Sequence, residues 1–171
     1  KKANRIGRLT TSGELSEFDV PTPAAGPDAI AVGPDGAIWF SETEADKIGR
    51  IDASGHITEF SEGLTQGSRP LALVERDGAL WFSQAGASRI GRIDPKGTIS
   101  SFPIPSDNSQ PRAIALHPAG GIWFVETNSN ALGRVDAHGH IHEFPVGIDN
   151  ASLRGVTAGA DGDLWFTANS A

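Results

Sequence analysis

The sequence contains no cysteine, no methionine and no tyrosine. Without cysteine the chain forms neither disulfide bonds nor thiolate metal sites, and it does not indicate a redox compartment. No apolar run approaches the roughly 20 residues that a membrane-spanning helix needs, so we expect no membrane partner. Because even an initiator methionine is missing, we expect a processed chain, an excised segment or an engineered protein.

Positive charge is also scarce. The 14 Lys and Arg residues stand against 21 Asp and Glu, which gives a net charge of -7, and the basic residues are scattered singly. Phosphate backbones are bound by clustered Lys and Arg, so we expect no nucleic-acid partner. The 171 residues predict a single domain, in either a cytoplasmic or a secreted protein.

What the sequence does contain is a repeat of 42 residues. A Trp-Phe pair, a Gly-Arg pair and a single Phe each recur at this interval, which is a signature of repeat architectures. The repeats cover about 1–40, 41–82, 83–124 and 125–166. The markers are Trp39-Phe40, Trp81-Phe82, Trp123-Phe124 and Trp165-Phe166; Gly7-Arg8, Gly49-Arg50, Gly91-Arg92 and Gly133-Arg134; and Phe18, Phe60, Phe102 and Phe144.

Each repeat holds four short apolar runs separated by turn residues, for example 29–32, 37–40, 48–51 and 56–60. Such runs predict four antiparallel strands. A four-stranded sheet of this size cannot bury both faces alone, so the sheets must stack radially on one another. The fold class is therefore an all-β propeller with four blades' worth of sequence, and adjacent Trp and Phe side chains should cover opposite faces of each blade.

The repeat is out of phase with the blades, which leaves complementary half-blades at 1–18 and 153–171. They can pair with each other and close one ring, or pair with another chain, and either arrangement removes exposed edges. Bulky Trp-Phe pairs suit a wide ring. We therefore expect a homodimer of eight blades, against a single four-bladed ring or a piece of a longer propeller.

Two segments carry a resemblance to a known family. Gly-Pro-Asp-Gly-Ala-Ile-Trp-Phe-Ser-Glu at 33–42 and the following 46–60 resemble the blades of streptogramin B lyase, also called virginiamycin B lyase, and 4–8 and 102–105 are similar as well. The likeness covers essentially the whole chain. It implies a seven-bladed propeller and, for the lyase members, a magnesium-assisted elimination that opens a cyclic depsipeptide antibiotic at an ester without using water.

The resemblance also implies where catalysis would occur. The family's catalytic histidines directly follow proline in a Pro-His-Ala/Gly-Ile motif that opens the inner strand, and this chain has Asp28, Leu71, Arg112 and Arg154 there. A general base is missing from that position. We therefore transfer no catalytic residue, and we expect no cofactor unless lyase activity is retained, in which case it is Mg²⁺.

The same positions give the candidate ligand site. Asp28, Arg112 and Arg154 should face the central opening, where guanidinium groups can hold an anionic or zwitterionic small molecule. The alternative is a hydrated channel without a dedicated ligand.

Two other groups of residues are candidate metal ligands. Glu42 and Glu126, with Gln84 at the equivalent position, could hold a hard cation such as Mg²⁺, or they could pair with the repeated arginines. His138, in the predicted hairpin turn, alternates with His140 and His142 toward the predicted outer strand, where the three form either a solvated rim or an adventitious transition-metal site.

Three functions remain open at this point. The first is a non-catalytic propeller scaffold, natural fragment or engineered, that oligomerises through its open half-blades. The second is a streptogramin B lyase-type carbon-oxygen lyase. The third is a small-molecule or protein binder at the central mouth. The missing Pro-His motif favours the first and the third.

Overall fold

The computed structural model describes residues 3–136 and 138–169, which form β-strands joined by turns. In these ranges no helix is long and apolar enough to cross a bilayer. The strands, in chain order, are β1 (Arg5–Leu9), β2 (Leu15–Asp19), β3 (Pro27–Val32), β4 (Ile38–Glu42), β5 (Lys47–Ile51), β6 (Ile57–Phe60), β7 (Pro70–Arg76), β8 (Ala79–Gln84), β9 (Arg89–Ile93), β10 (Ile99–Pro103), β11 (Pro111–Leu116), β12 (Ile122–Glu126), β13 (Ala131–Val135), β14 (Ile141–Pro145), β15 (Leu153–Ala158) and β16 (Leu164–Ala168).

The strands form five antiparallel sheets that follow one another along the chain. Three are four-stranded meanders, β3-β4-β5-β6, β7-β8-β9-β10 and β11-β12-β13-β14, which we call blades B, C and D. The pairs β1-β2 and β15-β16 are two-stranded and are called half-blades A and E. The predicted all-β propeller architecture is confirmed, as a partial propeller.

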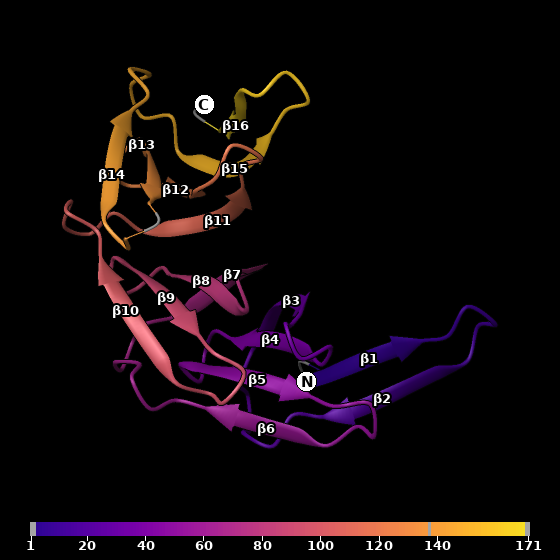
Figure 1. Cartoon of the computed structure of the whole chain (residues 1–171). Helices are drawn as coiled ribbons and strands as arrows, with labels where there is room; N and C mark the ends of the chain where they lie inside the picture. Colours follow the sequence, from indigo (N-terminus) through magenta and orange to yellow (C-terminus); the bar gives the residue numbers. More distant parts are fainter. Residues whose placement is uncertain (1–2, 137, 170–171) are drawn as a thin grey trace.

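The blades are arranged in an arc (Figure 1). The strands β3, β7, β11 and β15 lie on its inner side and the fourth strands β6, β10 and β14 on its outer side. Half-blades A and E lie at the two ends of the arc and belong to separate sheets, so they do not pair with each other into a single ring. The expected half-blades 1–18 and 153–171 include residues 1–2 and 170–171, which lie outside the described residues.

The hydrophobic core lies between the blades, as the adjacent Trp and Phe predict. Trp39 is fully buried in a cluster with Leu80 and Phe82 of blade C. The next residue, Phe40, is in a different cluster with Ile6 and Val20 on the half-blade A side. Successive side chains on a strand point to opposite faces, so this pair joins each blade to both of its neighbours.

Within a blade, two further contacts recur. The Trp of the second strand stacks on the Phe of the fourth, with ring centroids 5.4 Å apart for Trp39 and Phe60. The ring tip of the second-strand Phe lies against a glycine of the third strand, and a Cβ at Gly91 would lie only 2.2 Å from Cζ of Phe82. The glycine of the repeated Gly-Arg pair is therefore required by close packing.

The arginine of the same pair also has a structural contact. Arg50 lies over the Trp39 ring and donates from Nε to Asp35 at 2.6 Å, while Trp39 donates from Nε1 to the other Asp35 oxygen at 3.0 Å. The carboxylate of the first hairpin turn thus joins the Trp and the Arg across the blade. In blade D the equivalent turn residue is Ala119, and Nε1 of Trp123 and Nε of Arg134 are buried without a hydrogen-bond partner among the described residues.

Candidate functional site: the central mouth

Each inner strand begins with a β-bulge. The register between β3 and β4 shifts between Pro27 and Ile30, and the same shift follows the first residue of β7, β11 and β15. Bulges re-aim side chains and are common beside functional sites. Because Asp28, Arg112 and Arg154 lie within these bulges, the local backbone positions all three of the residues proposed from the sequence as ligands.

The residue before each bulge has a left-handed backbone. Its φ is 49° at Arg69, 53° at Gln110 and 45° at Ser152, a conformation that costs a side-chain-bearing residue roughly 1–2 kcal/mol. Asp46 of the preceding blade stabilises the first of these, because its carboxylate accepts hydrogen bonds from the backbone N–H of Arg69 at 2.8 Å and of Gly67 at 2.6 Å. The inner ends of the blades are thus strained but anchored to their neighbours.

The bulges of β3, β7 and β11 border a cavity of about 1120 Å³, which we call the central mouth. Asp28 and Arg112 line it together with Leu71, whereas Arg154, the third residue expected there, is not among the lining residues. Arg69 and Glu44 also line it and form an ion pair at 3.3 Å. Arg154 is exposed near this group, and its charge acts on Arg112.

The mouth has an excess of positive charge on one side. Burial lowers the pKa of Arg112, and the neighbouring guanidinium groups of Arg154 and Arg69 lower it further, with Asp28 acting in the opposite direction. Nε of Arg112 is buried and has no hydrogen-bond partner among the described residues. Like charges gathered around an unsatisfied donor are stabilised by an anion, which would supply both the acceptor and the opposite charge.

The sequence profile of the virginiamycin B lyase family matches residues 1–171. This chain belongs to that family. Virginiamycin B lyase from Staphylococcus aureus is a solved structure with 41% identity and a TM-score of 0.92, and the match covers 97% of this chain and 57% of that one. A streptogramin B lyase structure matches at 35% identity and a TM-score of 0.90, over 97% of this chain and 56% of the other.

A catalytically inactive histidine-to-alanine variant of the S. aureus virginiamycin B lyase, with quinupristin, matches at 41% identity and a TM-score of 0.92, over 97% of this chain and 57% of that one. The chain therefore spans a little over half the length of the lyases that it matches. A putative gluconolactonase shares the fold at 21% identity and a TM-score of 0.68. No curated protein matches the chain.

The two glutamates proposed as metal ligands in this virginiamycin B lyase family member belong to different blades. Glu42 and Glu126 lie in blades B and D, with blade C between them, and each is fully buried. Burial, and then the neighbouring Glu59, raises the pKa of Glu42 to about 8; burial and Glu143 do the same for Glu126. These raised pKa values favour the protonated form of both side chains near neutral pH, and a protonated carboxyl group is a poor ligand for Mg²⁺.

The alternative expectation, that these glutamates pair with the repeated arginines, is wrong. In the β4–β5 pair Glu42 is opposite Lys47, whereas Arg50 is opposite Trp39. The Arg50 guanidinium bonds to Asp35 in the hairpin turn instead. Glu42 lies at the end of β4 opposite Lys47, three residues beyond Trp39, and so does not compete with Asp35 for the Arg50 guanidinium.

The histidines all lie away from the mouth. His138, His140 and His142 are on the turn and outer strand of blade D, as predicted, and Asp136 at the start of the same turn joins them. His117 lies in the first hairpin turn of blade D, where Nε2 is 2.9 Å from the backbone oxygen of Gly162 in half-blade E.

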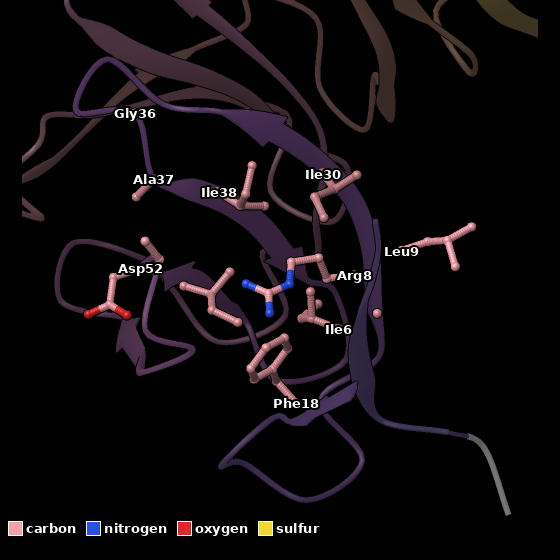
Figure 2. A pocket seen from close by; sticks show the side chains of 12 residues that line it. Ile6, Arg8, Leu9, Phe18, Ile30, Gly36, Ala37, Ile38 and Asp52 are labelled. Atoms are coloured by element: carbon pink, nitrogen blue, oxygen red, sulfur yellow. The ribbon is translucent and has the colours of Figure 1, made fainter. Parts of the chain in front are cut away.

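Sequence reasoning missed an apolar pocket of about 380 Å³ at the junction of half-blade A and blade B. Ile6, Phe18, Ile30 and Ile38 line it, and Arg8 extends over the Phe18 ring (Figure 2). The pocket exists because half-blade A has only the third and fourth strands of a blade, so the face of blade B beside the missing strands is open. The phase of the repeat, which leaves only a half-blade at 1–18, could have indicated this open face of blade B.

Proposed function

We propose that this member of the virginiamycin B lyase family is a non-catalytic propeller arc that assembles with a second copy, half-blade E of one chain pairing with half-blade A of the other into an eight-bladed ring. The observation that carries the proposal is the 61% exposure of Trp165, a residue whose three equivalents in blades B to D all pack against an outer-strand Phe. At the equivalent positions the tryptophan is covered by the fourth strand of its blade, so an exposed tryptophan here indicates that a partner strand is missing.

Half-blade E has the first two strands of a blade and lacks the last two. Asp161 already accepts a hydrogen bond from Nε1 of Trp165 at 3.3 Å, as Asp35 does from Trp39. In blade B the second carboxylate oxygen of Asp35 binds Arg50, whereas the described residues offer Asp161 no arginine. Half-blade E therefore lacks one arginine and one phenylalanine in defined places.

Half-blade A has those two side chains. Arg8 lies over the Phe18 ring at 5.6 Å, whereas Arg50 and Arg134 lie over the Trp of their own blades. If β16 pairs with β1 in the register that β12 has with β13, Trp165 is opposite Arg8 and Phe166 is opposite Gly7. The contacts of an ordinary blade are then completed, and two free sheet edges are paired.

Gly7 allows a selective test. A Cβ at Gly7 meets nothing within 4 Å in the single chain, but a Cβ at its equivalent Gly133 would lie 2.0 Å from Cζ of Phe124. Gly7→Ala should therefore leave the fold of the single chain intact and obstruct Phe166 of a second copy. Trp165→Ser should weaken assembly by removing the stacking side chain.

The measurement is mass in solution by light scattering over a range of protein concentrations. We expect twice 17.9 kDa for the unaltered chain and 17.9 kDa for Gly7→Ala and Trp165→Ser. Leu116→Ser is the matched control, because Leu116 is an exposed apolar residue outside both half-blades, and it should remain dimeric. An unaltered chain that stays at 17.9 kDa, or a Gly7→Ala variant as dimeric as its parent, would refute the proposal.

The proposal that this chain is not a lyase rests on the residues that begin the inner strands. The S. aureus lyase loses activity when one histidine is replaced, and here the four positions that open the inner strands are Asp28, Leu71, Arg112 and Arg154. None of the four is a histidine, the residue type that most often serves as a general base. We expect no ring opening of quinupristin in the presence of Mg²⁺, followed by mass spectrometry. Turnover that EDTA abolishes would assign this chain to the lyases instead.

A second candidate function is the binding of an anionic small molecule at the central mouth. The unpartnered Nε of Arg112 among three guanidinium groups favours it. Titration with citrate should give saturable binding that Arg112→Ala and Arg154→Ala weaken. Arg112→Lys, which keeps the charge but loses the fork, should bind more weakly than the parent, and unchanged affinity in all three variants excludes the site.

A further inference from the structure

The turn between the third and fourth strands has the same frame in every full blade. An aspartate at its start accepts two backbone N–H bonds through Oδ1. Asp94 accepts from Lys96 and Thr98, both at 2.9 Å. Asp136 in blade D accepts from His138 at 2.8 Å and His140 at 2.9 Å. These bonds fix the carboxylate and leave Oδ2 available.

Only blade D surrounds that free oxygen with imidazoles. Nδ1 of His140 is 3.4 Å from Oδ2 of Asp136, and Nε2 of His142 is 3.3 Å from the same atom. His138 completes the group, because one ligand atom each from Asp136, His138 and His140 lie within 4.8 Å of one another. The turn therefore gathers one carboxylate and up to three imidazoles at one point.

We propose that Asp136, His138 and His140 form a binding site for a divalent transition metal, Zn²⁺ in the first instance, on the outer rim of blade D. Carboxylate oxygen and imidazole nitrogen bind Zn²⁺ at about 2.0–2.2 Å, and three protein ligands with one open position are a common arrangement. The three side chains are exposed or half-buried, so rotamer changes can close the remaining gap. His142 acts as a positioning residue that holds the Asp136 carboxylate from β14.

The other blades provide internal comparisons. In blade B the turn offers Asp52 with Ser54 and a single histidine, His56, and in blade C it offers Asp94 with no histidine. The backbone frame is shared, so the imidazoles alone distinguish the proposed site. The residues of this turn do not line the mouth, and Gly139 within it packs against Phe102 of blade C, so the proposed site does not depend on the function proposed above.

The site is tested by titrating the chain with Zn²⁺ in a calorimeter, in the Gly7→Ala background so that assembly does not contribute. We expect one ion per chain, and a tetrahedral visible spectrum when Co²⁺ replaces Zn²⁺. His138→Ala and His140→Ala should each lower the affinity at least about tenfold, whereas the control His56→Ala should not change it. Thermal unfolding without metal should be unchanged in all three variants, since the histidines are on the surface.

Two results would overturn the proposal. One is an affinity for Zn²⁺ that survives both His138→Ala and His140→Ala, because the ion would then bind elsewhere. The other is a stoichiometry of one ion per two chains, because exposed histidines of two molecules would then share the metal and no site would exist on the single turn.

Discussion

The side-chain amide of Gln84 donates a 2.7 Å hydrogen bond to the hydroxyl of Ser101 across blade C. One repeat earlier the same two positions are Glu42 and Glu59, and one repeat later Glu126 and Glu143. A carboxylate at Glu42 offers no donor, and both its oxygens are buried without a hydrogen-bond partner among the described residues. A proton on Glu42 supplies the missing donor toward Glu59, whose own charge Lys47 neutralises at 2.9 Å.

The first prediction concerns pH. Because the pKa of Glu42 rises from 4.5 in the unfolded chain to about 8 in the fold, the folded state binds more protons between these values. The resulting stability is complete below pH 4.5 and is lost as the pH rises through 8. Thermal unfolding should therefore show a melting temperature that falls from pH 5 to pH 9 through this group and through Glu126.

Glu42→Gln copies the residue that blade C already has, and it should flatten this pH dependence. At pH 9 it should raise the free energy of unfolding by roughly 2 kcal/mol, with a smaller effect at pH 5. Glu62→Gln removes an exposed carboxylate and is the control. If both variants follow the pH profile of the parent chain, Glu42 is ionised in the fold and the argument fails.

The second prediction concerns the first hairpin turn of blade D, which has Ala119 where blade B has Asp35. Ala119→Asp places a carboxylate at the position that Asp35 has in blade B. There it can accept hydrogen bonds from Nε1 of Trp123 and Nε of Arg134. Satisfying two buried donors should increase the free energy of unfolding by about 1 kcal/mol in denaturant titrations. Asp35→Ala should have the opposite effect. A destabilised Ala119→Asp chain would show that the two turns are not equivalent.

The third prediction concerns the glycine beneath each buried phenylalanine. Gly91→Ala places a methyl group 2.2 Å from Cζ of Phe82 and should lower the free energy of unfolding by about 3 kcal/mol, because neither the strand nor the ring can move away cheaply. Adding Phe82→Leu should recover part of this loss, which a double-mutant cycle measures. Additive effects of the two substitutions would mean that the ring is not what the methyl group meets.

Much of the fold could be predicted because the residues that determine it recur every 42 positions. The adjacent Trp39 and Phe40 indicated a sheet with two buried faces, and the turn residues between the apolar runs indicated where strands end. Of the three residues expected at the mouth, Asp28 and Arg112 line its cavity and Arg154 does not, and whether they bind a ligand stays a prediction. Arg69 was missed because it precedes the proline in a left-handed conformation that no propensity favours. The raised pKa of Glu42 depends first on burial between blades and then on Glu59, a carboxylate two strands away in its own sheet, and spacing alone reveals neither.

The clusters between adjacent blades have a consequence for how such a chain can change in length. Every seam is built from the same kinds of side chain, so inserting or deleting one whole 42-residue unit replaces one seam by an equivalent one and requires no new packing chemistry. The number of blades in a closed ring is then decided by the small tilt between neighbours, summed around the circle. Duplication in this lineage can alter ring size while leaving the interior of each blade unchanged.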